Sequence, residues 1–204
     1  IDMPVNTTAK DIATFLKSTV YKIPSSLNLS RDTLKGDVTT QLKMDIIDYT
    51  SPKSDAVGFG ISGEFSNFHQ QNIYKGIDIS GFSGDVTASN HSFNVKAKGL
   101  LNTRKAMVEA SQSEKGKSRY YFNTTLPVTL LQSFDVDITD YAEGLIGAEV
   151  EYNQSPKAND KVKLALNLEN TALAFDALDW RKEKGLASTI SANATLSNRI
   201  VSLE

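Results

Sequence analysis

The chain has 204 residues and a formal net charge of -2; 40% of its residues are hydrophobic and 23% are charged. This balance is typical of a folded globular protein and excludes a mostly disordered chain. The small net charge gives no general attraction to nucleic-acid phosphates. The lack of cysteine excludes disulfide bonds and cysteine metal sites.

The sequence has no run of about 18 apolar residues, the length that a membrane-spanning helix needs. Its start also lacks the charged segment and apolar stretch of a secretory signal. Because the chain opens at Ile1 rather than at methionine, we expect a processed or excised piece of a longer protein, with any membrane anchor outside it.

Two short segments have the pattern of helices. Residues 9–22 follow the good N-cap residues Thr7 and Thr8, and they place Ile12 and Phe15 at helical spacing. A second, shorter helix is predicted after Pro127, because proline is favoured in the first turn of a helix.

Most other segments alternate apolar and polar residues, which is the period of a strand with one apolar face. The alternation is clearest at residues 38–46, 57–65, 93–97, 148–152 and 162–168. We therefore expect a mostly β fold. It would be a curved antiparallel sheet, taco-like or an open barrel or sandwich, with one N-terminal amphipathic helix and a second short helix.

The second half of the chain repeats the order of the first. Each half has a short apolar helix, a polar link, a strand after a glycine, a turn containing Ser-Pro, and another alternating strand. We expect a first helix-plus-sheet repeat at residues 1–125. A second, truncated repeat at residues 126–204 would continue the same sheet.

The most distinctive motif is LDWRKEKG at residues 178–185, and a second is the link that runs from Leu126-Pro127 to Gly144. With the order of helix, link, strand, Ser-Pro turn and strand, these motifs resemble the repeated units of the AsmA-like bacterial envelope proteins, in particular the YhdP and TamB branch. The likeness covers most of the chain, and its motifs are structural rather than catalytic.

This resemblance implies a segment of a long periplasmic protein that is anchored in the inner membrane and serves lipid transport and outer membrane biogenesis. In such proteins an apolar β-groove shields phospholipid acyl chains, so the implied partners are phospholipid and neighbouring repeats of the same chain. No cofactor and no nucleic acid are expected. The candidate groove residues come from the alternating strands: Val38, Leu42, Met44, Phe59, Ile61, Phe93, Val95, Val150, Leu164 and Leu166.

Motifs that would carry chemistry have better structural explanations. Residues 58–63 match G-x-G-x-x-G, but they continue a strand pattern instead of opening a helix. The aspartates between residues 135 and 140 lack the full spacing of a calcium loop. His69 and His91 have no third ligand at metal spacing. We therefore expect no enzyme, no catalytic residue and no metal site.

Two functions remain open. The first is lipid handling, and the second is a structural or protein-interaction β-module with a closed core and no lipid. Trp180 has two interpretations as well, a core residue at the end of the sheet or an interfacial anchor. The neighbouring Arg181, Lys182 and Lys184 are expected to be solvated.

Overall fold

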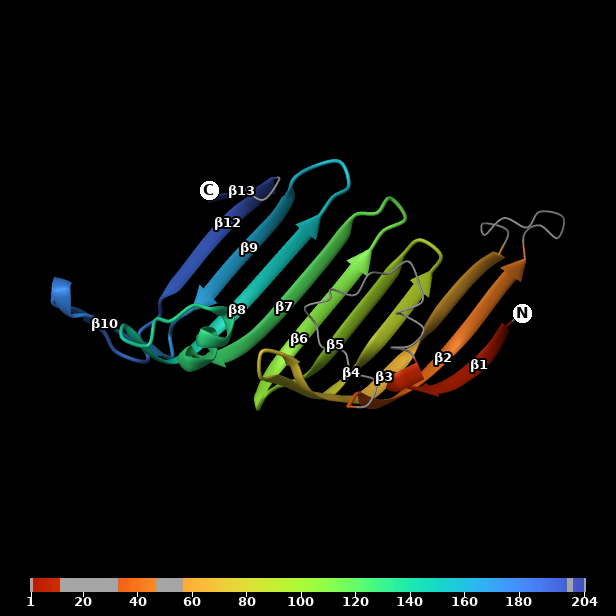
Figure 1. Ribbon diagram of the computed structural model, residues 1–204, viewed down its shortest axis with the longest axis horizontal. Coiled ribbons are helices and arrows are strands. Elements are labelled where there is room, and N and C mark those ends of the chain that lie inside the picture. Colours follow the sequence, from red (N-terminus) through yellow and green to blue (C-terminus); the bar gives the residue numbers. More distant parts are fainter. Residues whose placement is uncertain (1, 12–32, 47–56, 198–199, 204) are drawn as a thin grey trace.

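The computed structural model describes residues 2–11, 33–46, 57–197 and 200–203, and these ranges form one antiparallel sheet. The sheet is curved and open (Figure 1). It has thirteen strands, and its main path follows the chain from β1 to β9 and ends with β12 and β13. The hairpin of β10 and β11 is attached to β8. The predicted curved antiparallel fold is confirmed.

The described strands are β1 (Asp2–Thr8), β2 (Lys35–Ile46), β3 (Val57–Tyr74), β4 (Ile77–Ser89), β5 (Phe93–Leu101), β6 (Arg104–Gln112), β7 (Ser118–Pro127), β8 (Ala142–Gln154), β9 (Asp160–Asn167), β10 (Thr171–Phe175), β11 (Trp180–Lys182), β12 (Thr189–Ser197) and β13 (Ile200–Leu203). Two 3-10 helices interrupt them, η2 (Val128–Phe134) and η3 (Asp176–Leu178). None of the described helices is long and apolar enough to cross a membrane.

Both predicted helices begin where the sequence places them. The backbone N–H of Asp11 donates to Thr8 Oγ1 at 3.3 Å, and the backbone N–H of Thr8 donates to Asp11 Oδ2 at 3.4 Å, which is a reciprocal N-terminal cap. Residues 9–11 are helical, and the rest of the predicted N-terminal helix lies outside the described residues. The second predicted helix is confirmed as η2, which starts directly after Pro127.

The meander follows from short turns between consecutive strands. Lys75 and Gly76 join β3 to β4 with φ values of 38° and 84°, the positive pair that a tight hairpin turn of matching twist requires. Asn102 opens the turn from β5 to β6 at φ 53°. Beyond Phe65 the pairing of β3 with β4 shifts register repeatedly. Such bulges bend a strand and increase its twist, which contributes to the curvature.

The register separates the sheet into an apolar face and a polar face. One row across β2 to β9 and β12 contains Val38, Phe65, Gly84, Ala97, Val108, Phe122, Val150, Leu164 and Ala192. The adjacent row, displaced by one residue, contains Thr39, Glu64, Asp85, Lys96, Glu109, Tyr121, Glu151, Lys163 and Asn193. Because successive side chains point to opposite faces, the alternation along each strand becomes a two-faced sheet.

The buried core lies toward one end of the apolar face, where η2 and side chains of β3 pack against it. One cluster contains Ile77, Phe82, Ala97, Leu101, Ala106 and Leu126, with Leu130 of η2 packed against it. The other contains Val128, Ala142, Ile146 and Leu168, with Leu131 and Ile138 packed against it. Gly99 allows this packing, because a Cβ at that position would lie 2.5 Å from Phe82 Cδ2. We call this region the covered end of the apolar face.

The expected boundary between residues 125 and 126 falls inside β7. This strand pairs with β8 from Ser118 to Pro127, so residues on both sides of the boundary belong to one sheet. The internal duplication itself stays a prediction.

Candidate functional site

The predicted groove residues with described side chains share the apolar face. Leu42 is paired with Ile61, Val150 is paired with Leu164, and the others lie in the same or neighbouring rows. Val38 is buried, and the other described members are half-buried: Leu42, Ile61, Phe93, Val95, Val150, Leu164 and Leu166. Met44 and Phe59 are partners in the backbone register, and their side chains lie outside the described part of the structure.

The same face contains residues that the list of candidates omitted. Tyr120 and Phe122 of β7 lie between the candidates on β5 and those on β8, and Tyr152 and Val162 extend the rows on β8 and β9. In the sequence, Tyr120 and Phe122 alternate with Arg119 and Tyr121, and this alternation was sufficient to place them on the apolar face. The apolar rows are therefore continuous across the sheet, not divided into two patches.

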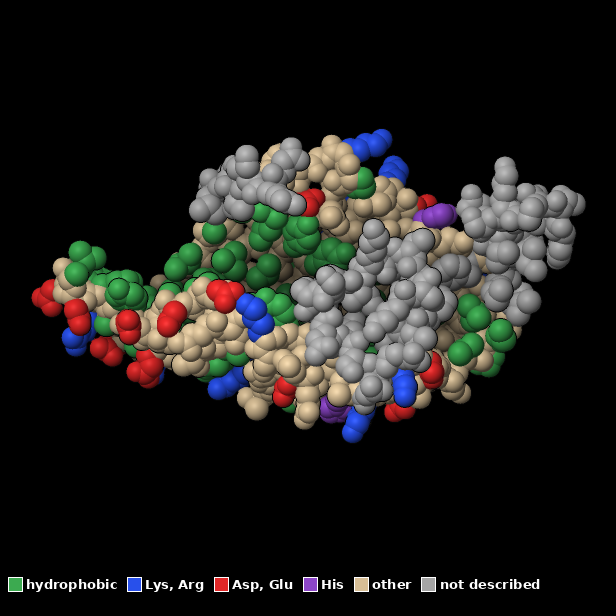
Figure 2. Space-filling model, viewed as in Figure 1, with side chains coloured by type: hydrophobic (Ala, Val, Ile, Leu, Met, Phe, Trp, Pro, Cys, Tyr) green, Lys and Arg blue, Asp and Glu red, His purple; other side chains and the backbone are tan. Residues whose placement is uncertain are grey.

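The middle of the apolar face is partly open among the described residues. Figure 2 shows hydrophobic side chains gathered in a hollow over β7, β8 and β9. Tyr120 of β7 is 39% exposed. Ile190 of β12, which is paired with Leu166 of β9, is 49% exposed. We call this region the open middle of the apolar face, and it leaves apolar side chains exposed among the described residues.

A tyrosine pair adds a polar group to the open middle. The rings of Tyr120 and Tyr152 stack with centroids 5.9 Å apart, and the Tyr152 hydroxyl donates to Asp160 Oδ2 at 2.6 Å. Burial, together with this hydrogen bond, raises the pKa of Tyr152 to about 12. The hydroxyl is therefore held neutral as a donor, and the rings present their apolar surfaces.

The polar face has the opposite chemistry. Arg119 lies between Glu151 and Glu109, with nitrogen to oxygen distances of 2.9 Å and 3.2 Å. The hydrogen bond to Glu151 raises the pKa of Arg119, and hydrogen bonds from Asn153 and then Arg119 lower the pKa of Glu151. These ion pairs are solvated, and they are typical of a face that meets water.

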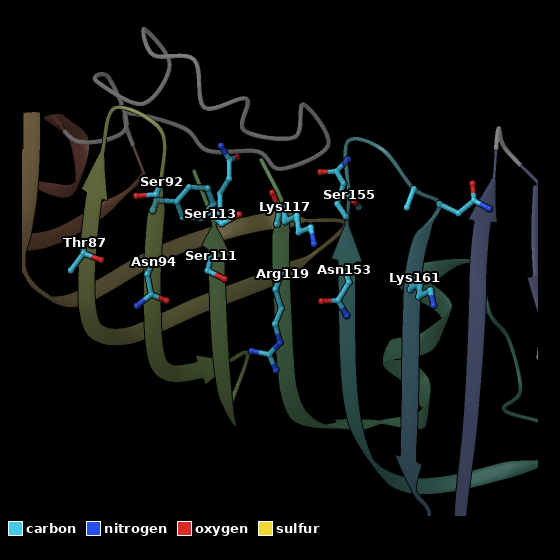
Figure 3. A pocket seen from close by; sticks show the side chains of 16 residues that line it. Thr87, Ser92, Asn94, Ser111, Ser113, Lys117, Arg119, Asn153, Ser155 and Lys161 are labelled. Atoms are coloured by element: carbon cyan, nitrogen blue, oxygen red, sulfur yellow. The ribbon is translucent and has the colours of Figure 1, made fainter. Parts of the chain in front are cut away.

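A cavity of about 560 Å³ lies at one end of the strands (Figure 3). Six of its lining residues form one register row of the polar face: Thr87, Asn94, Ser111, Arg119, Asn153 and Lys161. The described lining residues are mostly hydroxyl and amide side chains, with Lys117, Arg119 and Lys161 as the charged ones. Such a lining can hydrogen-bond a polar group.

The LDWRKEKG motif contains the end of η3, the strand β11 and the turn that follows it. Its structure corrects one expectation and decides between the two interpretations of Trp180. Lys182 is only 6% exposed, and its Nζ donates to the carbonyl oxygens of Leu168, Thr171 and Glu183 at 2.8, 2.9 and 3.2 Å. The expectation of a solvated Lys182 was wrong, because a neighbouring turn supplies carbonyl acceptors that sequence spacing does not reveal. Trp180 is 47% exposed, so it is not a core residue.

The other candidate motifs take structural roles. Residues 58–63 lie within β3 and open no helix. Asp135 pairs with Lys75 at 2.6 Å, whereas Asp137 accepts hydrogen bonds from Thr139 and Gln132. Among the residues that the structure describes, no group of three or more His, Asp and Glu side chains is placed to hold a metal ion.

Comparisons of the chain with protein-family models, curated proteins and solved structures found no match. The resemblance to AsmA-like proteins therefore stands on the sequence motifs alone, and function is inferred from the geometry of the sheet.

Proposed function

We propose that this chain is a non-enzymatic lipid-binding segment whose apolar face shields phospholipid acyl chains from water. The observation that carries the proposal is the open middle of that face. A sheet with one apolar face must bury it against another layer, and acyl chains supply such a layer. Each square ångström of apolar surface removed from water contributes about 25 cal/mol.

The two faces suit this role in different ways. Acyl chains would lie along the open middle, over Val150, Leu164 and Leu166, which are half-buried in the described structure. The ion pairs of the polar face would stay in water. Transport would be passive, since the mechanism needs apolar shielding and no acid, base or nucleophile.

The resemblance extends this proposal to a cellular setting. The chain would be part of an inner-membrane-anchored periplasmic protein that moves phospholipid between the inner and outer membranes. Neighbouring repeats would continue the apolar face, because the described sheet is open. The anchor would lie outside this chain.

The alternative is a closed structural module, which would need a second sheet packed against the apolar face. The described strands belong to one open sheet, and its covered end is closed by η2 instead. We therefore favour lipid, and the experiment below separates the two.

Native mass spectrometry of the chain purified from a bacterial host, followed by lipid extraction, tests the proposal. We expect bound phospholipid, and we expect Leu166→Asp to release it because the substitution places a charge on the apolar face. Asn167→Asp is the matched control, since residue 167 lies on the polar face and the same charge there leaves the acyl chains undisturbed. A lipid-free, folded and monodisperse protein would instead favour the structural module.

A further inference from the structure

The β10–β11 hairpin and η3 project from one end of the sheet (Figure 1, left). Large hydrophobic side chains are exposed on this projection, Phe175 at 36%, Leu178 at 76% and Trp180 at 47%, and beside it Tyr141, just before β8, is 52% exposed. We call these four residues the aromatic tip. Figure 2 shows hydrophobic side chains at the same end of the molecule, with acidic and basic side chains beside them. An exposed apolar cluster with a charged border is typical of an interaction site.

The aromatic tip is held in place by contacts within the hairpin and between the hairpin and Tyr141. The rings of Tyr141 and Phe175 stack at 5.6 Å, and Phe175 and Trp180 lie 5.7 Å apart as register partners. The backbone N–H of Ala174 donates to Tyr141 O at 2.9 Å. Buried Lys182 ties β11 to the turn before β10. The rings are therefore ordered before any partner arrives, which lowers the entropic cost of binding.

The aromatic tip continues the apolar face. Leu173, two residues before Phe175 on the same strand, packs against the cluster that contains Ile146 and Leu168. Leu166 of the proposed acyl-chain surface packs against the same cluster. Leu166 of the open middle and Leu173 of the hairpin therefore pack against the same buried cluster, which links the base of the hairpin to the apolar face.

The charges around the aromatic tip have both signs. Arg181 pairs with Asp176 at 3.4 Å, and Lys184 pairs with Glu143 at 2.7 Å. Asp179 and Asp140 add negative charge in the adjoining sequence. Mixed charges suit headgroups that carry both a phosphate and an ammonium, and the excess of carboxylates opposes anionic lipid.

We propose that the aromatic tip docks onto the surface of a zwitterionic phospholipid membrane. Tryptophan and tyrosine rings favour the level of the headgroups, where one side is apolar and the other is wet. The inference rests on the proposed function, because a segment that shields acyl chains must meet the membrane that supplies them. The docked hairpin would then hold the open middle of the same sheet close to the membrane surface.

Trp180 is the single tryptophan of the chain, so its fluorescence reports directly on the aromatic tip. The test is to titrate the full chain with phosphatidylcholine vesicles and to record the emission maximum of Trp180. We expect a blue shift that saturates with lipid. Leu178→Ser, which keeps the reporter, should weaken partitioning about tenfold because an exposed leucine no longer inserts.

Leu100→Ser is the matched control, since Leu100 is 39% exposed on β5, away from the hairpin. It should partition as the unmodified chain does. No blue shift with phosphatidylcholine would overturn the proposal, as would equal effects of the two substitutions. Tighter binding to anionic phosphatidylglycerol vesicles would overturn the assigned headgroup chemistry. A blue shift that depends on protein concentration and not on lipid would reassign the aromatic tip to contact between protein copies.

Failure of this inference and failure of the proposed function give different results. Vesicle docking is read from Trp180 at the hairpin, whereas retention of acyl chains is read from phospholipid that co-purifies with the chain and is lost in Leu166→Asp. A chain that docks and retains no lipid would keep the inference and remove the proposed function. A chain that retains lipid and shows no blue shift with vesicles would keep the proposed function and remove the inference of membrane docking.

Discussion

Ile146 and Ile190 lie on the same face of the same sheet, yet Ile146 is 4% exposed and Ile190 is 49% exposed. Ile146 belongs to the covered end, where Val128 of η2 and Leu131 pack beside it. Ile190 belongs to the open middle, opposite Leu166. Two features of the structure separate these identical side chains. Residues of η2 pack on Ile146, whereas Ile190 is paired with β9 on one side and lies outside the residues of β12 that pair with β13.

This difference assigns separate tasks to the two regions. The covered end contains most of the buried hydrophobic residues that the structure describes, so it stabilises the fold. The open middle keeps apolar surface in contact with water, which costs free energy unless a ligand covers it. Stability should therefore be most sensitive to substitutions at the covered end, and ligand binding to those in the open middle.

The largest expected effect is at Ile146. Ile146→Ala should lower the free energy of unfolding by about 3 kcal/mol, because it leaves a cavity in a packed cluster. Ile190→Ala should lower it by less than about 1 kcal/mol, since the side chain is already half in water. Urea denaturation of both variants gives the comparison, and equal losses would contradict the assignment of a covered end.

The next effect is at Lys182. Lys182→Met should lower the free energy of unfolding by about 2 kcal/mol, because the carbonyl oxygens of Leu168 and Thr171 lose their donor in a buried site. Lys184→Met is the control, since Lys184 is exposed and pairs with Glu143 on the surface. Thermal unfolding should separate the two lysines clearly. Equal losses of stability in the two variants would contradict the specific role of the buried hydrogen bonds that Lys182 donates.

A smaller effect depends on pH and concerns the open middle. The pKa of Tyr152 rises from 10.0 to about 12 in the folded chain, so its contribution to stability is fully present below pH 10. That contribution is lost as the pH rises toward 12, because the unfolded chain releases the proton first. Chemical denaturation across this range should show a steeper loss of stability in the unmodified chain than in Tyr152→Phe. Parallel curves would contradict the raised pKa that burial and the hydrogen bond to Asp160 give Tyr152.

The smallest effect is expected on the polar face. Arg119→Met should change the free energy of unfolding by less than about 1 kcal/mol, because water screens its pairs with Glu109 and Glu151. Binding of a fluorescent fatty acid should be unchanged. A large loss of either property would show that the polar face does more than meet solvent.

The sequence predicted the features that local residue patterns determine, which are the strands and the starts of the helices. Alternation predicted the strands, Thr8 predicted the start of the N-terminal helix, and Pro127 predicted the start of η2. The sequence did not predict the burial of Lys182, whose acceptors at Leu168 and Thr171 come from a turn more than ten residues away. It also left the position of Trp180 open, because alternation does not tell which apolar residues another segment will cover.

The most direct test of the central claim is a fluorescent fatty acid titration of two variants that receive the same lysine on adjacent residues. Leu164→Lys places the charge in the open middle, and Ala165→Lys places it on the polar face opposite Glu149. Circular dichroism first establishes that both remain folded. We predict that Leu164→Lys loses binding and that Ala165→Lys binds as the unmodified chain does. If the two variants bind equally, or if the unmodified chain does not bind, the apolar face is not a site for acyl chains.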